Sequence, residues 1–216
     1  MIENRFFQAA RTGKYDFWRY LLTILLVTFL FLSGGVCLLA AVLISGSTDL
    51  LSLPPALFLA LNLVPFFFVL VGLGIALPLF HQRSLLTLVN PGGRFALKPF
   101  LISAAAWLLV STAGDVTLSL LQPGNYVFSF DLARFLPWLV VAILLLPFQC
   151  AAEELFFRGY LTQGLGLAGG FWLAWLVPSL LFGLLHGANP EVLQYGLALT
   201  LPVYIGTGLL MGWITL

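Results

Sequence analysis

Two adjacent glutamates and an arginine lie in an otherwise apolar stretch, and their types suit acid–base chemistry. Glu153, Glu154 and Arg158 occur in the run Cys-Ala-Ala-Glu-Glu-Leu-Phe-Phe-Arg-Gly-Tyr, residues 150–160. On a helix, Glu154 and Arg158 are four positions apart on one face, so they can pair and lower the cost of burying their charges. Glu153 points about 100° away from that pair. A desolvated carboxylate without a partner is suited to act as a general base.

The same three residues have a simpler interpretation. A charge inside a membrane costs roughly 2.5–3.5 kcal/mol on insertion scales, and charges therefore gather at the ends of spans. A charge cluster that anchors a span at the cytoplasmic face would also contain paired acids and an arginine. The residues of this stretch alone leave both interpretations open.

A second polar feature ends a later apolar run, Phe182-Gly-Leu-Leu-His186. His186 is one of only two histidines in the chain. Imidazole gains and loses a proton near neutral pH and can activate water, but a lone histidine at the end of a span also serves as an interfacial or capping residue. The Asn189-Pro190 pair that follows is typical of a turn.

Together the two features resemble the EExxxR and FxxxH motifs of the CAAX-protease and bacteriocin-processing family (CPBP, or Abi), which includes the type II CAAX prenyl endopeptidases. Glu153, Glu154 and Arg158 match the first motif, and Phe182 and His186 match the second. The resemblance covers residues 133–216, which we expect to form a partial protease core. The preceding spans match only as apolar helices.

The resemblance implies an intramembrane endopeptidase that hydrolyses a peptide bond in or near the membrane. It assigns Glu153 and His186 to activation of the attacking water, with Glu154 and Arg158 as orienting and charge-balancing support. No cofactor is expected to be required. A divalent metal such as zinc is not favoured, because a catalytic zinc takes about three protein ligands and adjacent glutamates cannot both face one ion from a regular helix. If a metal is used, Glu153 and His186 would be its ligands.

One motif of that family, HxxxN or HxxxD on a later helix, has no counterpart, because no histidine follows His186. In the family its residues are thought to complete the site and stabilise the oxyanion, and loss of one oxyanion donor costs about 10²–10³ in rate. Two interpretations follow: a chain truncated before the last family helices, or a member that has lost part of its site. We favour truncation, because Leu216 lies inside an apolar run.

The composition predicts where such chemistry would take place. Hydrophobic residues make up 61% of the 216 positions and charged residues 8%, against about 25% charged in soluble domains. So few charges cannot cover a surface that faces water, but apolar side chains can cover one that faces lipid. The net charge of +1, without a basic tract, gives no support to nucleic-acid binding.

Six long apolar runs predict an all-α, polytopic transmembrane helix bundle that forms a single membrane domain over residues 1–216. The expected spans are residues 18–44, 54–80, 99–121, 132–148, 170–186 and 192–216, with a glycine-rich turn at 164–170. A fourth helix that ended at Phe148 would leave Glu153 and His186 at opposite membrane faces. The protease interpretation therefore requires one helix from Leu132 to Gly164.

The distribution of lysine and arginine predicts the orientation. Seven of these residues lie in the N-terminal segment and in the 81–98 connection, and none lies in the loops around Asp49 and at 122–131. By the positive-inside rule the N-terminus is cytoplasmic. The expected partners are the lipid bilayer and a membrane-embedded or membrane-associated peptide, and family resemblance suggests a bacterial inner membrane. The sequence does not identify the substrate.

Asp115 lies inside the third apolar run, where an ionisable residue is a functional candidate by default. A carboxylate near the end of its span and satisfied by Ser111, Thr112 or Ser119 is an equally good interpretation. A small ion-coupled transporter that uses Asp115 with Glu153 and Glu154 is one alternative function. A catalytically silent immunity or scaffold protein of the membrane is another.

Two further patterns carry structural predictions. Gly208 and Gly212 form a GxxxG motif, which is typical of helix packing, and we expect it to pack inside the bundle. His81 follows the second span close to Arg83, and we expect it to be solvated in a loop.

Overall fold

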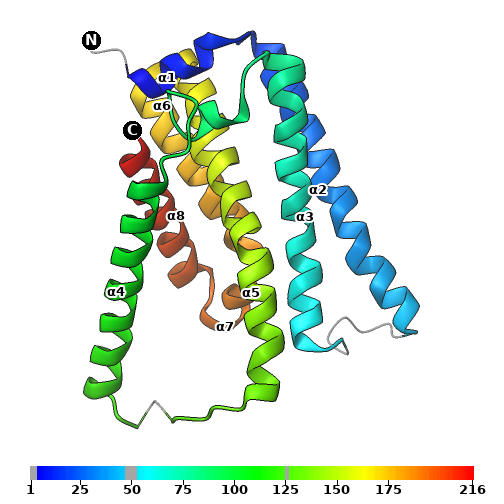
Figure 1. Ribbon diagram of the computed structural model, residues 1–216, viewed down its shortest axis with the longest axis vertical. Coiled ribbons are helices and arrows are strands. Elements are labelled where there is room, and N and C mark those ends of the chain that lie inside the picture. Colours follow the sequence, from blue (N-terminus) through cyan, green and yellow to red (C-terminus); the bar gives the residue numbers. More distant parts are fainter. Residues whose placement is uncertain (1–3, 47–52, 125–126) are drawn as a thin grey trace. The chain divides into compact units, whose positions relative to one another are not determined.

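The computed structural model describes residues 4–46, 53–124 and 127–216 (Figure 1). Asp49 lies outside these ranges. The lack of lysine and arginine in the loop around it supports the predicted orientation. Within the described residues all regular elements are helices, and five segments are long and apolar enough to cross a membrane: Phe17–Ile44, Pro55–His81, Leu97–Leu121, Leu132–Ala188 and Leu197–Thr215. The chain is therefore an all-α polytopic membrane protein, as its composition predicted.

The fourth segment contains two of the six predicted spans. It is 57 residues long and comprises α5 (Leu132–Glu153), the π-helix η5 (Glu154–Leu161) and α6 (Thr162–Leu185). The backbone leaves helical geometry only at Gly169 and Gly170, and Gly170 has φ +72°, a conformation that glycine adopts without strain. The turn predicted at 164–170 is therefore wrong in extent, because the helix continues past Gly164.

The sixth predicted span also begins later than expected. A short helix, α7 (Pro190–Tyr195), precedes α8 (Leu197–Thr215). The two are separated by Gly196, whose φ is +78°. The predicted start near residue 192 is wrong because this change in backbone direction interrupts the apolar run.

The chain divides into two compact units, residues 1–94 with 140–216, and residues 95–139. The second unit contains α4 (Leu97–Leu121), which is long and apolar enough to cross a membrane. In α4 the hydroxyls of Ser111 and Ser119 donate to the backbone carbonyls of Trp107 and Val116. Each hydroxyl has one proton, so these two serines do not donate to Asp115, and Thr112 is the remaining hydroxyl of the three proposed for that role.

In the first unit, α2 (Phe17–Ser45) and α3 (Pro55–Ala76) form a hairpin, blue and cyan in Figure 1. Gly72 of α3 allows this close packing, because a Cβ atom there would lie 3.1 Å from Val27 Cγ2 of α2. Leu73 and Leu77 are fully buried in the resulting core.

Helices α6 and α8 form the second packed pair of this unit. A Cβ atom on Gly208 would lie 2.8 Å from the backbone oxygen of Ser179, and the Ser179 hydroxyl donates to the Gly208 carbonyl over 2.9 Å. Gly212 packs in the same way against Trp175. The prediction that the GxxxG motif packs inside the bundle is therefore confirmed.

A buried polar cluster, here called the polar clasp, joins the α2–α3 hairpin to the helix that contains Glu153. His81, in the π-helix η3 (Leu77–His81), is 0% exposed, so the prediction that it is solvated is wrong. Its Nδ1 lies 2.8 Å from the carbonyl of Lys14, which can only accept, so Nδ1 carries the proton of the neutral ring. Its Nε2 then accepts from the Tyr160 hydroxyl over 2.9 Å.

Arg83 forms the other half of the polar clasp. Its Nη1 donates to Gln163 Oε1 over 2.6 Å, and the Gln163 amide nitrogen donates to the Thr87 carbonyl over 2.7 Å. Burial lowers the pKa of the Arg83 guanidinium from its usual value, which still leaves a cation at neutral pH. These bonds satisfy His81 and one nitrogen of Arg83, whereas Nε and Nη2 of Arg83 are buried without a hydrogen-bond partner among the described residues.

The two glycines of α8 on either side of Thr207 allow a matched test of the α6–α8 contact. We expect Gly208→Ala to destabilise the protein by about 1–3 kcal/mol, because the added methyl group forces the two backbones apart. Gly206 has open space around the same position, so Gly206→Ala should not destabilise the fold. Thermal unfolding in detergent measures both, and equal stabilities of the two variants would contradict this packing.

The hydrogen bond between Tyr160 and His81 can be tested in the same assay. We expect Tyr160→Phe to cost about 0.5–1.5 kcal/mol, because it removes the shorter of the two hydroxyl contacts at the buried Nε2 of His81 and leaves that of Thr23 Oγ1, at 3.3 Å. Tyr195 is 56% exposed, and Tyr195→Phe serves as the control. If Tyr160→Phe unfolds at the parent temperature, this bond does not hold the hairpin.

Candidate active site

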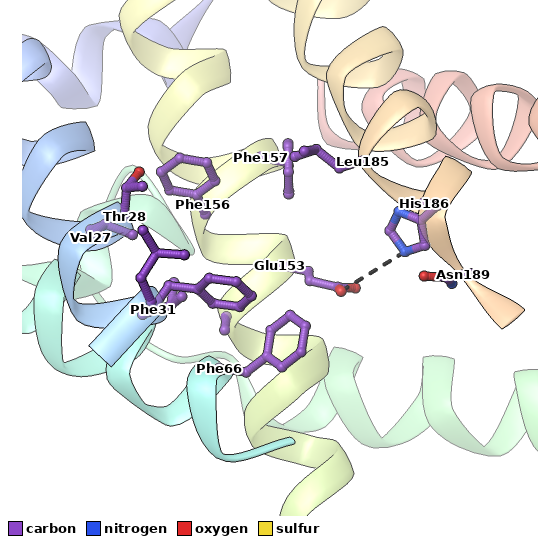
Figure 2. A pocket seen from close by; sticks show the side chains of 13 residues that line it. Val27, Thr28, Phe31, Phe66, Glu153, Phe156, Phe157, Leu185, His186 and Asn189 are labelled. Carbon is purple, nitrogen blue, oxygen red and sulfur yellow. Dashed lines mark ion pairs between the residues drawn. The ribbon is translucent and has the colours of Figure 1, made fainter. Parts of the chain in front are cut away.

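The structure brings Glu153 and His186 together, although 33 positions separate them in the chain. Glu153 is the last residue of α5, and His186 follows the end of α6 as the first residue of η6 (His186–Ala188). Because the helix continues from Leu132 to beyond Gly164, the side chains of Glu153 and His186 lie at the same depth in the helix bundle. The Oε1 atom of Glu153 lies 3.9 Å from Nε2 of His186 (Figure 2).

The tautomer of the neutral His186 ring follows from the contact of its other nitrogen. Nδ1 lies 2.7 Å from the backbone oxygen of Phe182, which only accepts, so Nδ1 carries the proton and Nε2 of the neutral ring has a free lone pair. The carboxylate oxygen and Nε2 are then two acceptors at a distance too long for a direct hydrogen bond. A water molecule that donates one hydrogen to each would fit this spacing.

Gln149 is a site residue that the sequence analysis missed. Its side-chain amide donates to Oε1 of Glu153 over 3.0 Å. The two residues are one helical turn apart, so they lie on the same face. One feature of the sequence could have identified Gln149: it is an amide side chain four positions before Glu153 in an apolar helix, where an unpaired polar group is costly.

Glu154 faces Arg158 and not the Glu153–His186 pair. Oε1 of Glu154 lies 3.2 Å from Nη1 of Arg158, as the helical spacing predicted, with Arg158 4% and Glu154 51% exposed. The guanidinium also lies over the Phe182 ring, 4.0 Å from its centroid. Since the Phe182 carbonyl holds His186, the arginine supports the imidazole indirectly. The residues from Glu154 to Leu161 form a π-helix, a form found frequently at functional sites.

A cavity of about 480 Å³ opens beside Glu153 and His186. Its walls come from the α2–α3 hairpin, the end of α5, η5 and the end of α6, and they are mainly apolar and aromatic (Figure 2). The lining residues are Val27, Thr28, Phe31, Leu32, Phe66, Val69, Ala152, Glu153, Phe156, Phe157, Leu185, His186 and Asn189. The site thus combines an apolar chamber with a small polar end, the usual composition of a ligand pocket.

Two more residues complete the polar end. The Tyr204 ring of α8 packs against the His186 ring with centroids 4.8 Å apart. Asn189 is part of a turn, as predicted, but it also lines the cavity. Its amide nitrogen donates to the Tyr204 hydroxyl over 3.3 Å. Neither residue was expected near the site from the sequence.

The donor set of the described residues does not fit a catalytic zinc. Across residues 4–46, 53–124 and 127–216, no three or more His, Cys, Asp or Glu side chains are placed to hold a metal ion. Glu154 is turned toward Arg158, so only Glu153 and His186 remain, one ligand fewer than a catalytic zinc takes.

Comparison with known proteins identifies a relative of this chain. A Bacillus subtilis (strain 168) protein described as "Uncharacterized protein YyaK" is 29% identical over 191 residues, which cover 83% of this chain and 64% of that protein. The chain thus spans less than two thirds of the length of this relative. No solved structure matches the chain significantly.

A family model matches the part of the chain that contains both motifs. It describes type II CAAX prenyl endopeptidase Rce1-like proteins, and its match begins one residue after the start of α5 and ends at Leu216. The relationship predicted from Glu153, Glu154, Arg158, Phe182 and His186 is therefore confirmed: residues 133–216 match the Rce1-like family of type II CAAX prenyl endopeptidases.

Proposed function

We propose that this chain is an intramembrane endopeptidase in which Glu153 and His186 activate water for attack on a peptide bond. The observation that carries the proposal is the approach of the Glu153 carboxylate to Nε2 of His186, 3.9 Å apart at the polar end of an apolar cavity. A general acid–base pair typically contributes 10²–10⁴ to the rate.

In the proposed reaction, a water molecule is held between the two acceptors. As its oxygen attacks the carbonyl carbon, Glu153 takes one proton, and a tetrahedral intermediate with a negatively charged oxygen forms. Collapse of this intermediate breaks the carbon–nitrogen bond. The proton then passes to the leaving nitrogen, which restores the ionised carboxylate. Nε2 of His186 accepts a hydrogen bond from the second hydrogen of the attacking water and so orients it.

Gln149 and Arg158 would support this pair. Gln149 fixes one carboxylate oxygen of Glu153 through its amide. Arg158 neutralises Glu154, which keeps a second negative charge from the water site, and packs on Phe182. Such support acts by positioning, because the geometry of reacting groups must be held closely for catalysis.

The cavity supports a substrate that enters from the membrane. Its walls are mainly aromatic and aliphatic, and they would bury apolar side chains of a membrane-embedded or membrane-associated peptide. We further propose that the protein resides in a bacterial inner membrane with a cytoplasmic N-terminus, since the lysine and arginine distribution favours that orientation.

Cleavage of a membrane-embedded reporter peptide tests the proposal. In the full reading frame of the source gene, we expect Glu153→Ala and His186→Ala each to reduce cleavage at least about 100-fold, because each removes one half of the acid–base pair. A chelator should leave the parent rate unchanged, since the donor set does not fit zinc. Asp131→Ala, which removes an exposed carboxylate paired with Arg134, is the control.

Other results would separate the alternatives. Cleavage that survives both substitutions would remove Glu153 and His186 from the mechanism. An intact protein that never cleaves would favour a scaffold or immunity role that keeps the motifs without the chemistry. Proton-coupled uptake that depends on Asp115, Glu153 and Glu154 would instead favour a transporter.

The supporting role of Arg158 gives a separate prediction. We expect Arg158→Met to lower cleavage about 10- to 100-fold, because loss of the guanidinium lets Phe182 and the carbonyl that holds His186 move. Arg134, whose side chain is 89% exposed, provides the matched control Arg134→Met. Unchanged cleavage by a folded Arg158→Met variant would contradict the indirect support of His186.

A further inference from the structure

Among the described residues, two aromatic rings contact the imidazole of His186, one from its own helix and one from another. The Phe182 ring, one turn earlier, has its centroid 4.2 Å from that of the imidazole, and the Tyr204 ring of α8 has its centroid 4.8 Å away. We propose that Tyr204 is a positioning residue, whose ring holds the imidazole in the orientation that presents Nε2 to the attacking water. This inference rests on the proposed endopeptidase function.

The hydrogen bond to Phe182 does not fix the imidazole by itself. Nδ1 of His186 lies 2.7 Å from the Phe182 carbonyl, but the second side-chain torsion of a histidine has a broad energy minimum. One hydrogen bond therefore leaves the ring free to rock. Phe182 also belongs to α6, which ends directly before His186. A contact from a different helix is required to hold the ring relative to the rest of the bundle.

Tyr204 supplies this contact because α6 and α8 approach each other closely at a glycine. A Cβ atom on Gly183 would overlap the Ile205 side chain and would lie 2.9 Å from the backbone nitrogen of Ile205. Tyr204 directly precedes Ile205 in α8, and His186 follows Gly183 by three positions. The absence of a side chain at Gly183 thus lets the Tyr204 ring reach the imidazole.

The hydroxyl of Tyr204 contacts the segment that follows His186. It accepts from the amide nitrogen of Asn189 over 3.3 Å and donates to Oε2 of Glu191 over 3.4 Å. Both bonds are long, so we expect the ring to contribute more to the position of His186 than the hydroxyl does. One side chain of α8 nevertheless contacts the imidazole and the start of α7 together.

Tyr204 is placed to act through His186 and not on the substrate. His186 lines the cavity, whereas Tyr204 is not one of its lining residues. A group that only orients a reacting side chain affects the chemical step more than substrate binding. Loss of the Tyr204 ring should therefore lower kcat and leave KM unchanged.

Replacement of the ring tests the proposal in the reporter-cleavage assay. We expect Tyr204→Leu to lower kcat about 10- to 100-fold with KM unchanged, because a small misplacement of a reacting group has a loss of this size. Tyr204→Phe keeps the ring and should retain kcat within about threefold, since the hydroxyl bonds are long. Tyr195→Leu is the matched control, because Tyr195 is 56% exposed.

Thermal unfolding in detergent verifies that each variant is folded. If Tyr204→Leu does not fold, Tyr204→Met takes its place, because methionine is flexible and fills gaps but has no flat ring.

Nitrogen-15 NMR of the imidazoles provides a measurement that does not depend on cleavage. The chain has two histidines, and the signals lost in His186→Ala identify those of His186. We expect the neutral ring to carry its proton on Nδ1 in the parent and in Tyr204→Phe. In Tyr204→Leu both tautomers should be populated, because the imidazole is then free to turn away from the Phe182 carbonyl.

Three results in the cleavage assay would overturn the role of Tyr204 and leave the Glu153–His186 proposal intact. They are a parental kcat in a folded Tyr204→Leu variant, a raised KM with unchanged kcat, and a loss in Tyr204→Phe as large as that in Tyr204→Leu. A His186 ring that keeps the parent tautomer in Tyr204→Leu would overturn it as well. If the parent protein does not cleave the reporter, the proposed function fails, and the tautomer measurement alone decides whether Tyr204 positions the imidazole.

Discussion

The buried hydrogen bond between His81 and Tyr160 is the constraint on which the candidate site depends. In the hydrocarbon region polar groups must find partners within the protein, because lipid offers none. His81 ends the α2–α3 hairpin, and Tyr160 lies in the π-helix that begins directly after Glu153. The bond therefore links the hairpin to the helix that contains the carboxylate, and with it one wall of the cavity to the other.

A second contact places His186. Helix α6 is held close to α8 by glycines, with Gly183 against Ile205 and Gly208 against Ser179. This packing brings Tyr204 of α8 against the imidazole. Two separate packing systems, the polar clasp and the α6–α8 contact, thus set the single distance between carboxylate and imidazole. A displacement in either packing system would change the distance between the carboxylate and the imidazole, because a close-packed interior leaves little room for local adjustment.

The sequence predicted those features that depend on neighbours along one helix. Composition predicted the membrane fold, and spacing predicted the Glu154–Arg158 pair and the packing role of Gly208. It did not predict the burial of His81 or the place of Asn189, because both depend on partners far away in the chain or across the bundle. A histidine beside an arginine is usually solvated, and an Asn-Pro pair usually forms a turn. Tertiary contacts decide otherwise here.

Because the cavity walls are mainly apolar, few polar side chains are available for the proposed chemistry. A peptide bond that enters the chamber leaves its water partners behind, and the mainly apolar walls replace few of them. Low local polarity also strengthens each remaining electrostatic interaction. A carboxylate and an imidazole therefore act strongly on a bound water molecule, provided that each is held by a neighbour. Gln149 holds the carboxylate and Phe182 the imidazole, so both proposed reacting groups have their own support.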